Sequence, residues 1–418
     1  MSSGNGASVS GSSGSGSGGS GGGAAPAVVD ADIRAQATSS GNGAGGSGSS
    51  GGGSGGSGGG TAPAVVDADI RAQAIAFSSK QPKQGSPRTP FRLTPDRVYT
   101  RKFFGSGKLL MPDGKTVRFW GFEDKTSGRR LPSPLIRATE GEIVHVTLHS
   151  SKRTHTIHLH GIEAEPWNDG VGHTSFEITG QYTYQFRPAT AGTYFYHCHV
   201  NTVLHVQMGM FGALIVDPYP THNAAGRRLA FTGGPAYDVE RLWVAFSIDP
   251  NWRRLNHAAG LDGSDAGLNI FNPKYDLING IPQPLGPTAE ITHPDVAVRA
   301  KVGQTVLVRL VSAGYMQKEW TFHPGRTHGK RLDVQVVAAD GRPFVATNAA
   351  GGTFHPRFPR QALRMGPAER YDCIVTAPVP DVYPVTIGTF DWLSLEDAGQ
   401  PHADRLRGTA RTTITFTE

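Results

Sequence analysis

Short runs of apolar residues, closed by turn-forming groups, set the pattern of the chain from about Thr89 onwards. The first block of runs reads KTVRFWGF, EIVHVTLHS, HTIHLHGI, QYTYQFRP, GTYFYHCHV and FGALIVDP, with PDG, EGE, NDG and ATAG between them. Short runs rich in β-branched and aromatic residues, separated by Gly, Pro and Asp, are typical of strands in a sandwich or barrel. The pattern therefore predicts an all-β protein.

A second block of the same kind begins near Leu242. Its runs are LWVAFSI, AVRAKVGQTVLVRLVSAG, LDVQVVAADGRPF, ERYDCIVTAP, YPVTIGTF and a final RTTITF. Residues 250–290 are rich in Asn, Gly and Pro, and we expect long loops there. Because VDPYP at 216–220 closes the first block, two β domains in series are expected, over residues 89–220 and 221–418.

The first 88 residues have a different pattern. SSGNGA recurs at 2 and 39, and APAVVDADIRAQA recurs at 25–37 and 62–74, so the segment is a tandem duplication with a spacing of 37 residues. Gly/Ser-rich stretches separate the copies, and such a composition buries too little apolar surface to fold. We expect residues 1–88 to form a disordered tail.

Composition excludes several classes of protein. Among the 418 residues, 40 Lys and Arg stand against 34 Asp and Glu without a dense basic run, which is too weak an excess to indicate nucleic-acid binding. No apolar stretch of about 18 residues is present, so no membrane-spanning helix is expected. The N-terminal MSSGNGASVSGSSG lacks the basic and apolar regions of a cleaved export signal.

The chain has two cysteines, too few for a disulfide framework. Cys373 lies in the strand-like run RYDCIV and is expected to be a small buried hydrophobe. Cys198 has a different setting, between two histidines.

Two histidine-rich segments indicate metal chemistry: HTIHLHG at 155–161, and HCH at 197–199 with His205 and Met210 in the following loop. Side chains on a strand alternate between its two faces. If each segment is a strand, His158 and His160 share one face while His155 points the other way. His197 and His199 likewise share a face, opposite to Cys198.

This alternation predicts two sets of metal ligands. The inward set is His155, Cys198, His205 and Met210, which is the two-His, one-Cys and weak axial Met arrangement of a type 1 (blue) copper site. The outward set is His158, His160, His197 and His199. A tetrahedral zinc site fits poorly, because one cysteine between two oppositely facing histidines cannot converge with both of them.

At these residues the chain resembles the multicopper oxidases, the laccase-like and copper-resistance branch of the cupredoxin superfamily. PSPLIRATEGE, THTIHLHGI, WNDGV and GTYFYHCHV…GMFGALIVDP follow the pattern of the family's first domain, and VRLVSAG…VVAADGRPF…MGPAERYDCIV is similar to its copper-free second domain. The resemblance covers most of residues 90–390. It implies two cupredoxin-like Greek-key β-sandwich or barrel domains, the second without copper.

The resemblance also implies roles for individual residues. His158 would bind type 2 copper, His160, His197 and His199 would bind the type 3 pair, and Asp169 in WNDGV would assist proton delivery as a catalytic residue.

The pattern departs from the usual three-domain enzymes, whose first domain has Ser where Cys198 stands. A type 1 site in the first domain is similar to nitrite reductases and some two-domain laccases.

A complete trinuclear cluster in this family uses eight histidines from four HxH elements, and the chain shows only two such elements. A head-to-head homodimer would supply eight. In a trimer, the second domain of a neighbour would cover the outward histidines instead, with His323, His328 and His355 as its candidate residues. An incomplete cluster would leave an electron-transfer centre alone.

The leading functional hypothesis is an oxidase that takes single electrons from a small reducing substrate, a phenol or a metal ion, through an exposed edge of His205 and reduces O₂. A copper nitrite reductase and a non-catalytic blue-copper electron carrier are the alternatives. The family generally works outside the cytoplasm, although no export signal is visible.

Overall fold

The computed structural model describes residues 93–344, 362–391 and 402–418. The expected tail, residues 1–88, lies outside these ranges, as does His355. Within the described residues, the prediction of an all-β protein is confirmed. The first half contains β1 (Arg97–Leu110), β2 (Thr116–Glu123), β3 (Ile136–Thr139), β4 (Val144–His155), β5 (His158–His160), η1 (Pro166–Asn168), β6 (Ile178–Phe186), β7 (Gly192–His197), α2 (Thr202–Met208) and β8 (Phe211–Asp217).

The second half is built mainly from two larger sheets and one small one. Its elements are β9 (Arg228–Leu229), β10 (Ala236–Tyr237), β11 (Val239–Ile248), η2 (Trp252–Arg254), β12 (Tyr275–Ile278), β13 (Ile281–Pro282), β14 (Val298–Lys301), β15 (Val306–Ser312), β16 (Gln317–Phe322), β17 (Asp333–Ala339), β18 (Arg342–Pro343), β19 (Leu363–Met365), β20 (Arg370–Thr376), β21 (Asp381–Phe390), η4 (His402–Arg405) and β22 (Leu406–Thr417).

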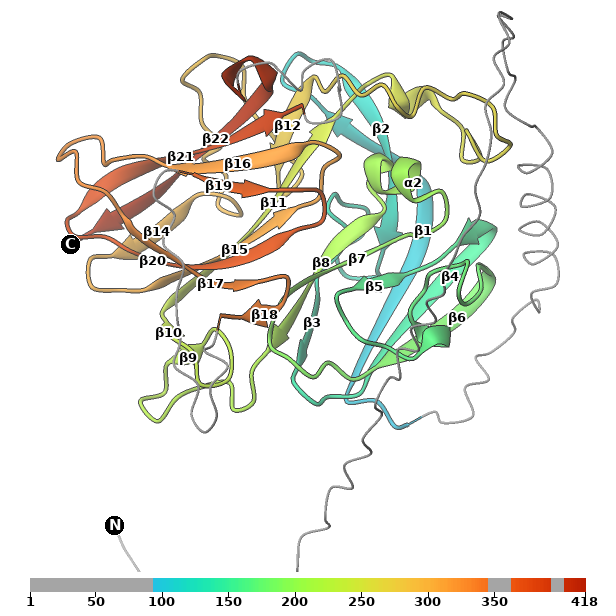
Figure 1. The fold of residues 1–418 in the computed structure, drawn as a ribbon, viewed down its shortest axis with the longest axis horizontal. Coiled ribbons are helices and arrows are strands. Elements are labelled where there is room, and N and C mark those ends of the chain that lie inside the picture. Colours follow the sequence, from blue (N-terminus) through green and yellow to red (C-terminus); the bar gives the residue numbers. More distant parts are fainter. Residues whose placement is uncertain (1–92, 345–361, 392–401) are drawn as a thin grey trace, which may run out of the picture. The chain divides into compact units, whose positions relative to one another are not determined.

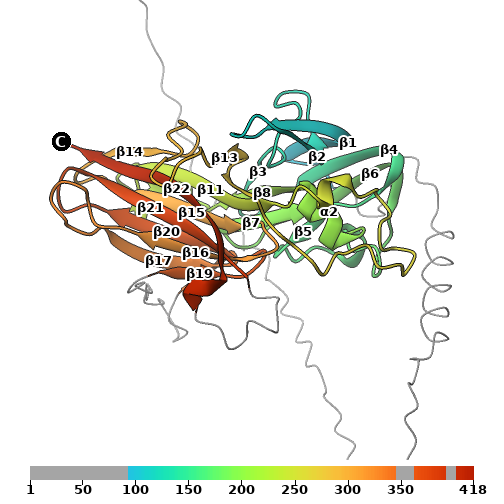
Figure 2. The ribbon, with the colours of Figure 1, turned by 90° about the horizontal axis from the view of Figure 1, so that it is seen from above.

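Each half is a sandwich of two sheets around its own core. In the first half, sheets ordered β2-β1-β4-β6 and β3-β8-β7-β5 face each other across one apolar cluster that includes Val146, Tyr184 and Leu214. In the second half, the sheets β13-β12-β11-β15-β20-β17-β18 and β14-β22-β21-β16-β19 share a cluster around Trp243 and Trp320. Figure 1 shows the two sandwiches as a blue-to-green group and a yellow-to-red group, and Figure 2 shows the same groups from above.

The two halves repeat one pairing pattern. β1 runs parallel to β4, which pairs antiparallel with β6; β11 runs parallel to β15, which pairs antiparallel with β20. β3–β8 and β14–β22 are likewise parallel pairs next to antiparallel ones. No sheet in the described ranges includes strands from both sides of residue 220. The division at that residue stays a prediction.

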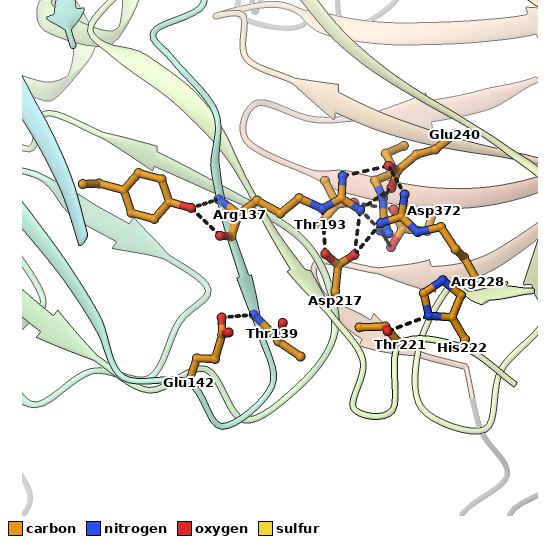
Figure 3. Close-up of polar contacts among 12 residues, drawn as sticks. Arg137, Thr139, Glu142, Thr193, Asp217, Thr221, His222, Arg228, Glu240 and Asp372 are labelled. Carbon is orange, nitrogen blue, oxygen red and sulfur yellow. Dashed lines mark hydrogen bonds and ion pairs between the residues drawn. The ribbon is translucent and has the colours of Figure 1, made fainter. Parts of the chain in front are cut away.

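A shared apolar cluster and an ion network join the halves. Phe104, Phe195 and Phe211 of the first half pack with Phe246 and Leu277 of the second. The ion network consists of Arg137, Asp217, Glu240, Arg309 and Asp372. All of these except Arg309 are labelled in Figure 3.

Arg137 is the link from the first half, because its guanidinium contacts Asp217 at 2.6 Å and Glu240 at 2.8 Å. These contacts hold the start of β11 next to the first sandwich.

The sequence patterns located most strands, with one informative error. HTIHLHG was expected to be one strand, but β4 ends at His155 and β5 begins at His158 in a different sheet. Thr156 lies in the break and its Oγ1 accepts a hydrogen bond from the His199 backbone N–H at 2.8 Å. The break therefore ties the two histidine segments together. Cys373 is fully buried in β20, as expected.

Candidate metal centres

Strand pairing brings the two histidine segments into register. β5 pairs antiparallel with β7, so that His158 lies opposite His197 and His160 opposite Phe195. Cys198 follows the last residue of β7, and its backbone N–H donates to the Met210 carbonyl at 3.0 Å. The two ends of the loop from Cys198 to Met210 are therefore hydrogen-bonded to each other, and the loop contains α2.

The loop from Cys198 to Met210 directs His205 back to the thiol. Cys198 Sγ lies 3.3 Å from His205 Nδ1 and 3.5 Å from His155 Nδ1. Gly209 caps the end of α2 with a φ of 111°, in the left-handed region, and an added Cβ there would lie 2.7 Å from the Trp120 carbonyl oxygen. The turn needs glycine.

The inward set of predicted ligands is completely enclosed. Cys198, His155, His205 and Met210 each have 0% exposure, and Cys198 and Met210 belong to the same apolar cluster. The structure thus gathers all four predicted type 1 residues in one buried region. The expectation of an exposed His205 edge is wrong, because a loop of the second half covers that ring.

Burial keeps these groups neutral in the metal-free protein. It raises the pKa of the Cys198 thiol to about 12 and lowers the pKa of His205 to about 3. The pKa of His155 is lowered well below its usual value, first by burial and then by the neighbouring His205 and His257. Neutral imidazoles are the form that binds metal ions.

The outward histidines form the second group. Their ring centroids are 5.1 Å apart for His158 and His197, 5.3 Å for His158 and His199, and 5.5 Å for His160 and His197. One nitrogen each of His158, His160 and His197 lies within 4.8 Å of the others. All four predicted outward residues are therefore neighbours.

Hydrogen bonds orient two of these rings. His158 Nδ1 donates to the Asp169 backbone oxygen at 2.8 Å, and His197 Nδ1 donates to the Cys198 backbone oxygen at 2.9 Å. Each bond places the ring proton on Nδ1 and leaves the lone pair on Nε2. This is how metal-binding histidines are usually held.

Asp169 is placed by the short helix η1. The buried Asn168 side-chain oxygen accepts hydrogen bonds from Tyr182 OH and the Gln185 N–H, both at 3.1 Å, which fixes the end of η1 against β6. Asp169 Oδ1 then lies 3.4 Å from His158 Nδ1. The predicted carboxylate is beside the cluster, half-buried.

The outward histidines face a cavity of about 510 Å³. Its far wall belongs to the second half and consists of Ala313, Gly314, Tyr315, Pro367 and Ala368. None of these side chains is a strong metal ligand. His323 Nε2 lies 2.9 Å from Thr386 Oγ1, and His328 Nδ1 lies 3.3 Å from Asp381 Oδ2. Neither histidine lines this cavity.

One histidine was missed by the sequence analysis. His257 lies in the loop between η2 and β12, and it is 8% exposed. Its ring centroid is 4.2 Å from that of His205 and 4.7 Å from that of His155, and it stacks on Trp120 at 5.8 Å. No local motif marks this residue, since a single histidine in NHAAG has no partner nearby in sequence.

This region is similar in sequence to known proteins. The sequence profile of a family described as multicopper oxidase matches residues 107–221, which include every predicted metal ligand. Over these residues the chain is similar to the multicopper oxidases.

Two curated relatives carry names consistent with this domain. The multicopper oxidase of Mycobacterium tuberculosis is 29% identical over 60% of this chain and 47% of its own length. An L-ascorbate oxidase of Cucumis sativus is 40% identical over 36% of this chain and 24% of its own length. The chain thus spans about half, or less, of the relatives it matches.

Solved structures support the cupredoxin-like fold. A blue copper oxidase from Nitrosomonas europaea is similar with a TM-score of 0.51 and 24% identity, covering 77% of this chain and 86% of its own. A copper nitrite reductase from the same organism has a TM-score of 0.52 and 21% identity, covering 77% and 94%. The coverage extends beyond the multicopper oxidase domain into the second half. No helix in the described part of the chain is long and apolar enough to cross a membrane.

Proposed function

We propose that the protein is a laccase-like copper oxidase, which takes single electrons from a small reducing substrate and passes them to O₂. The observation that carries this proposal is the sequence His197-Cys198-His199, in which the thiol faces His155 and His205 while the two flanking imidazoles face His158. A thiolate site and a histidine site are therefore joined by adjacent residues.

The residues fit copper. A soft thiolate, two imidazole nitrogens and a buried methionine are the donor set of a type 1 site, and imidazoles alone suit type 2 and type 3 copper. The donor set is preorganised, since His205 Nε2 donates to the His257 carbonyl at 3.2 Å and leaves Nδ1 for the metal. When bound, copper supplies one-electron transfer at the first set and the reduction of O₂ at the second.

The chain provides the route between the two sets. An electron passes from the Cys198 side chain into the backbone, and the neighbouring residues His197 and His199 carry the electron to the outward cluster. Because His205 is enclosed, an electron from the substrate enters through the covering loop around His257, which is itself 8% exposed. This route replaces the exposed His205 edge expected from sequence.

Asp169 is proposed to hold and deliver protons. Reduction of O₂ to two waters takes up four electrons and four protons, so a proton carrier must lie near the cluster. The Asp169 carboxylate is half-buried and lies 3.4 Å from His158 Nδ1. Asp169 is therefore close enough to the cluster to act as that carrier.

We also propose that another copy of the chain completes the cluster. Four outward histidines are half of the eight that a trinuclear cluster requires, and the described residues of the second half add no histidine around the cavity. A head-to-head dimer and a trimer with a neighbour's second domain both remain open. Copper analysis tests the proposal: two to three copper ions per chain are expected, and one per chain would refute it.

Oxygen uptake tests the activity itself. The copper-loaded chain is expected to consume one O₂ for every four molecules of a one-electron phenolic dye that it oxidises, and Cys198→Ser is expected to consume none. Cys373→Ser, a change at the other buried cysteine, is the control and should keep the activity. Nitrite turnover without O₂ uptake would indicate a nitrite reductase, and a blue protein active in neither assay would indicate an electron carrier.

A further inference from the structure

The loop that carries His257 is fastened to the first half of the molecule. Arg253 Nη1, in η2, donates to the Met208 carbonyl at 2.8 Å, and Asn201 Nδ2 donates to the Ala259 carbonyl at 2.9 Å. Met208 and Asn201 lie at the two ends of α2, the helix that contains His205. Two hydrogen bonds, one at each end of α2, therefore hold the His257 loop against the inward site.

Three imidazoles meet at this point. The ring centroids of His155, His205 and His257 are 4.2 to 5.2 Å apart, and one nitrogen from each lies within 4.8 Å of the other two. Zinc–nitrogen bonds of about 2.0–2.1 Å place bound nitrogens about 3.4 Å apart, so small rotations of the rings bring the three within range of one ion.

Two nitrogens of this group have no partner. His155 Nε2 and His257 Nε2 are buried, and no described residue forms a hydrogen bond with either. Buried polar atoms in native proteins are nearly always paired, because an unpaired one costs about 1–3 kcal/mol. Two such atoms on neighbouring rings point to a cation as their common partner.

We propose that His155, His205 and His257 form a three-imidazole site for Zn²⁺ or Cu²⁺. This site is an alternative to the thiolate set, because both use His155 and His205, and a chain holds one ion or the other. Three histidines with an open fourth position suit zinc, whereas the thiolate favours copper. The proposal shares two residues with the proposed type 1 site but does not depend on oxidase activity.

The direct test counts zinc ions in a chain without the thiol. Cys198→Ser is dialysed against Zn²⁺ beside two double variants, Cys198→Ser/His257→Ala and Cys198→Ser/His257→Gln. All three retain the outward histidines, so the difference in bound zinc reports the three-imidazole site alone. One more zinc ion per chain is expected in the single variant than in either double variant.

A matched control removes a histidine elsewhere. His222 is exposed and its ring contacts Thr221. Cys198→Ser/His222→Ala should bind as much zinc as Cys198→Ser. Equal zinc in the His257 variants and their parent would overturn the proposal, as would an equal loss in the His222 variant. The glutamine variant guards against misfolding, since it keeps most of the volume of the side chain.

A second test uses the native cysteine. Excess Zn²⁺ added before copper should slow the appearance of the blue band near ~600 nm roughly tenfold in the wild-type chain, and should have little effect in His257→Ala. Equal slowing in both would overturn the proposal. A wild-type chain that never turns blue would instead contradict the copper assignment, and the zinc count would still stand.

Discussion

Cys198 is an unusual thiol because it is fully buried, has its pKa raised to about 12 by that burial, and yet lies within 3.5 Å of two imidazoles. A metal ion that binds the thiolate must displace a proton that the fold otherwise retains. Copper binding at the proposed type 1 site should therefore depend on pH and on the presence of both histidines.

Replacement of the thiol should abolish the blue colour. Cys198→Ser is expected to lose the absorbance near ~600 nm completely, because that band arises from the copper–thiolate bond. Cys373 is equally buried, in the core of the second half, and Cys373→Ser should keep the absorbance. Absorbance of the copper-loaded variants checks this, and a blue Cys198→Ser variant would contradict the assignment.

The buried histidines predict the pH dependence of stability. Burial lowers the pKa of His160 and His257 to about 4 and that of His205 to about 3, below the unfolded value of about 6.5. Between those values the unfolded chain binds more protons than the folded one. The metal-free protein should therefore lose stability as pH falls from about 6.5 towards 4.

The raised pKa of Cys198 acts at the other end of the range. The unfolded thiol ionises near pH 8.5 while the folded one keeps its proton, so stability should also fall above about pH 9. Urea unfolding of the metal-free chain from pH 4 to 10 should show a maximum between the two limits. A stability that rises steadily as the solution is acidified would contradict the buried, neutral histidines.

At the scale of elements, the turn after η1 positions Asp169 and His158. Gly170 has a φ of +75°, and an added Cβ would collide with the backbone oxygen of Ile157, next to His158. Gly114 has nearly the same φ, +77°, with nothing within 4 Å of the added atom. A comparison of these two glycines therefore separates the cost of the left-handed backbone from the cost of steric crowding.

Gly170→Ala should therefore be much more damaging than Gly114→Ala. The left-handed conformation costs each alanine about 1–2 kcal/mol. Gly170→Ala should cost roughly 3 kcal/mol or more, because the backbone beside His158 must move. Chemical unfolding and copper content measure both effects, and only Gly170→Ala should lose copper from the outward cluster. Equal effects would show that the turn does not support the cluster.

Periodicity in the sequence located most of the strands and divided the candidate ligands into the two sets that the structure brings together. It could not show that Thr156 interrupts the first segment, because the break depends on a hydrogen bond to His199, 43 residues away. It could not find His257 either, since that residue reaches the site only when the second half packs on the first.

At the scale of the molecule, an ion network joins the two halves. Arg309 is 0% exposed and lies 2.7 Å from Glu240 and 3.2 Å from Asp372. The pKa of Glu240 is lowered to about 2: its guanidinium neighbours Arg309 and Arg137 outweigh the opposing effect of burial. Sequence gave no sign of this network, because its charges come from strands far apart in the chain.

Removal of Arg309 should destabilise the whole chain. Arg309→Met leaves the buried Asp372 carboxylate without its cationic partner, which typically costs about 3–5 kcal/mol. Arg97→Met breaks the exposed pair with Glu142 and should cost about 1 kcal/mol or less. The free energy of unfolding in urea compares the two. Similar losses would mean that the network does not hold the halves together.

The reoxidation of the reduced, copper-loaded chain tests most directly whether the thiolate set and the outward histidines act together. Dithionite removes the blue band without O₂, and the band near ~600 nm is then followed as O₂ is admitted. The account predicts that colour returns in the wild-type chain but not in His199→Ala, which keeps the thiolate set intact. A wild-type chain that stays colourless in O₂ would contradict this account. So would a His199→Ala variant whose blue band returns as fast as that of the wild-type chain.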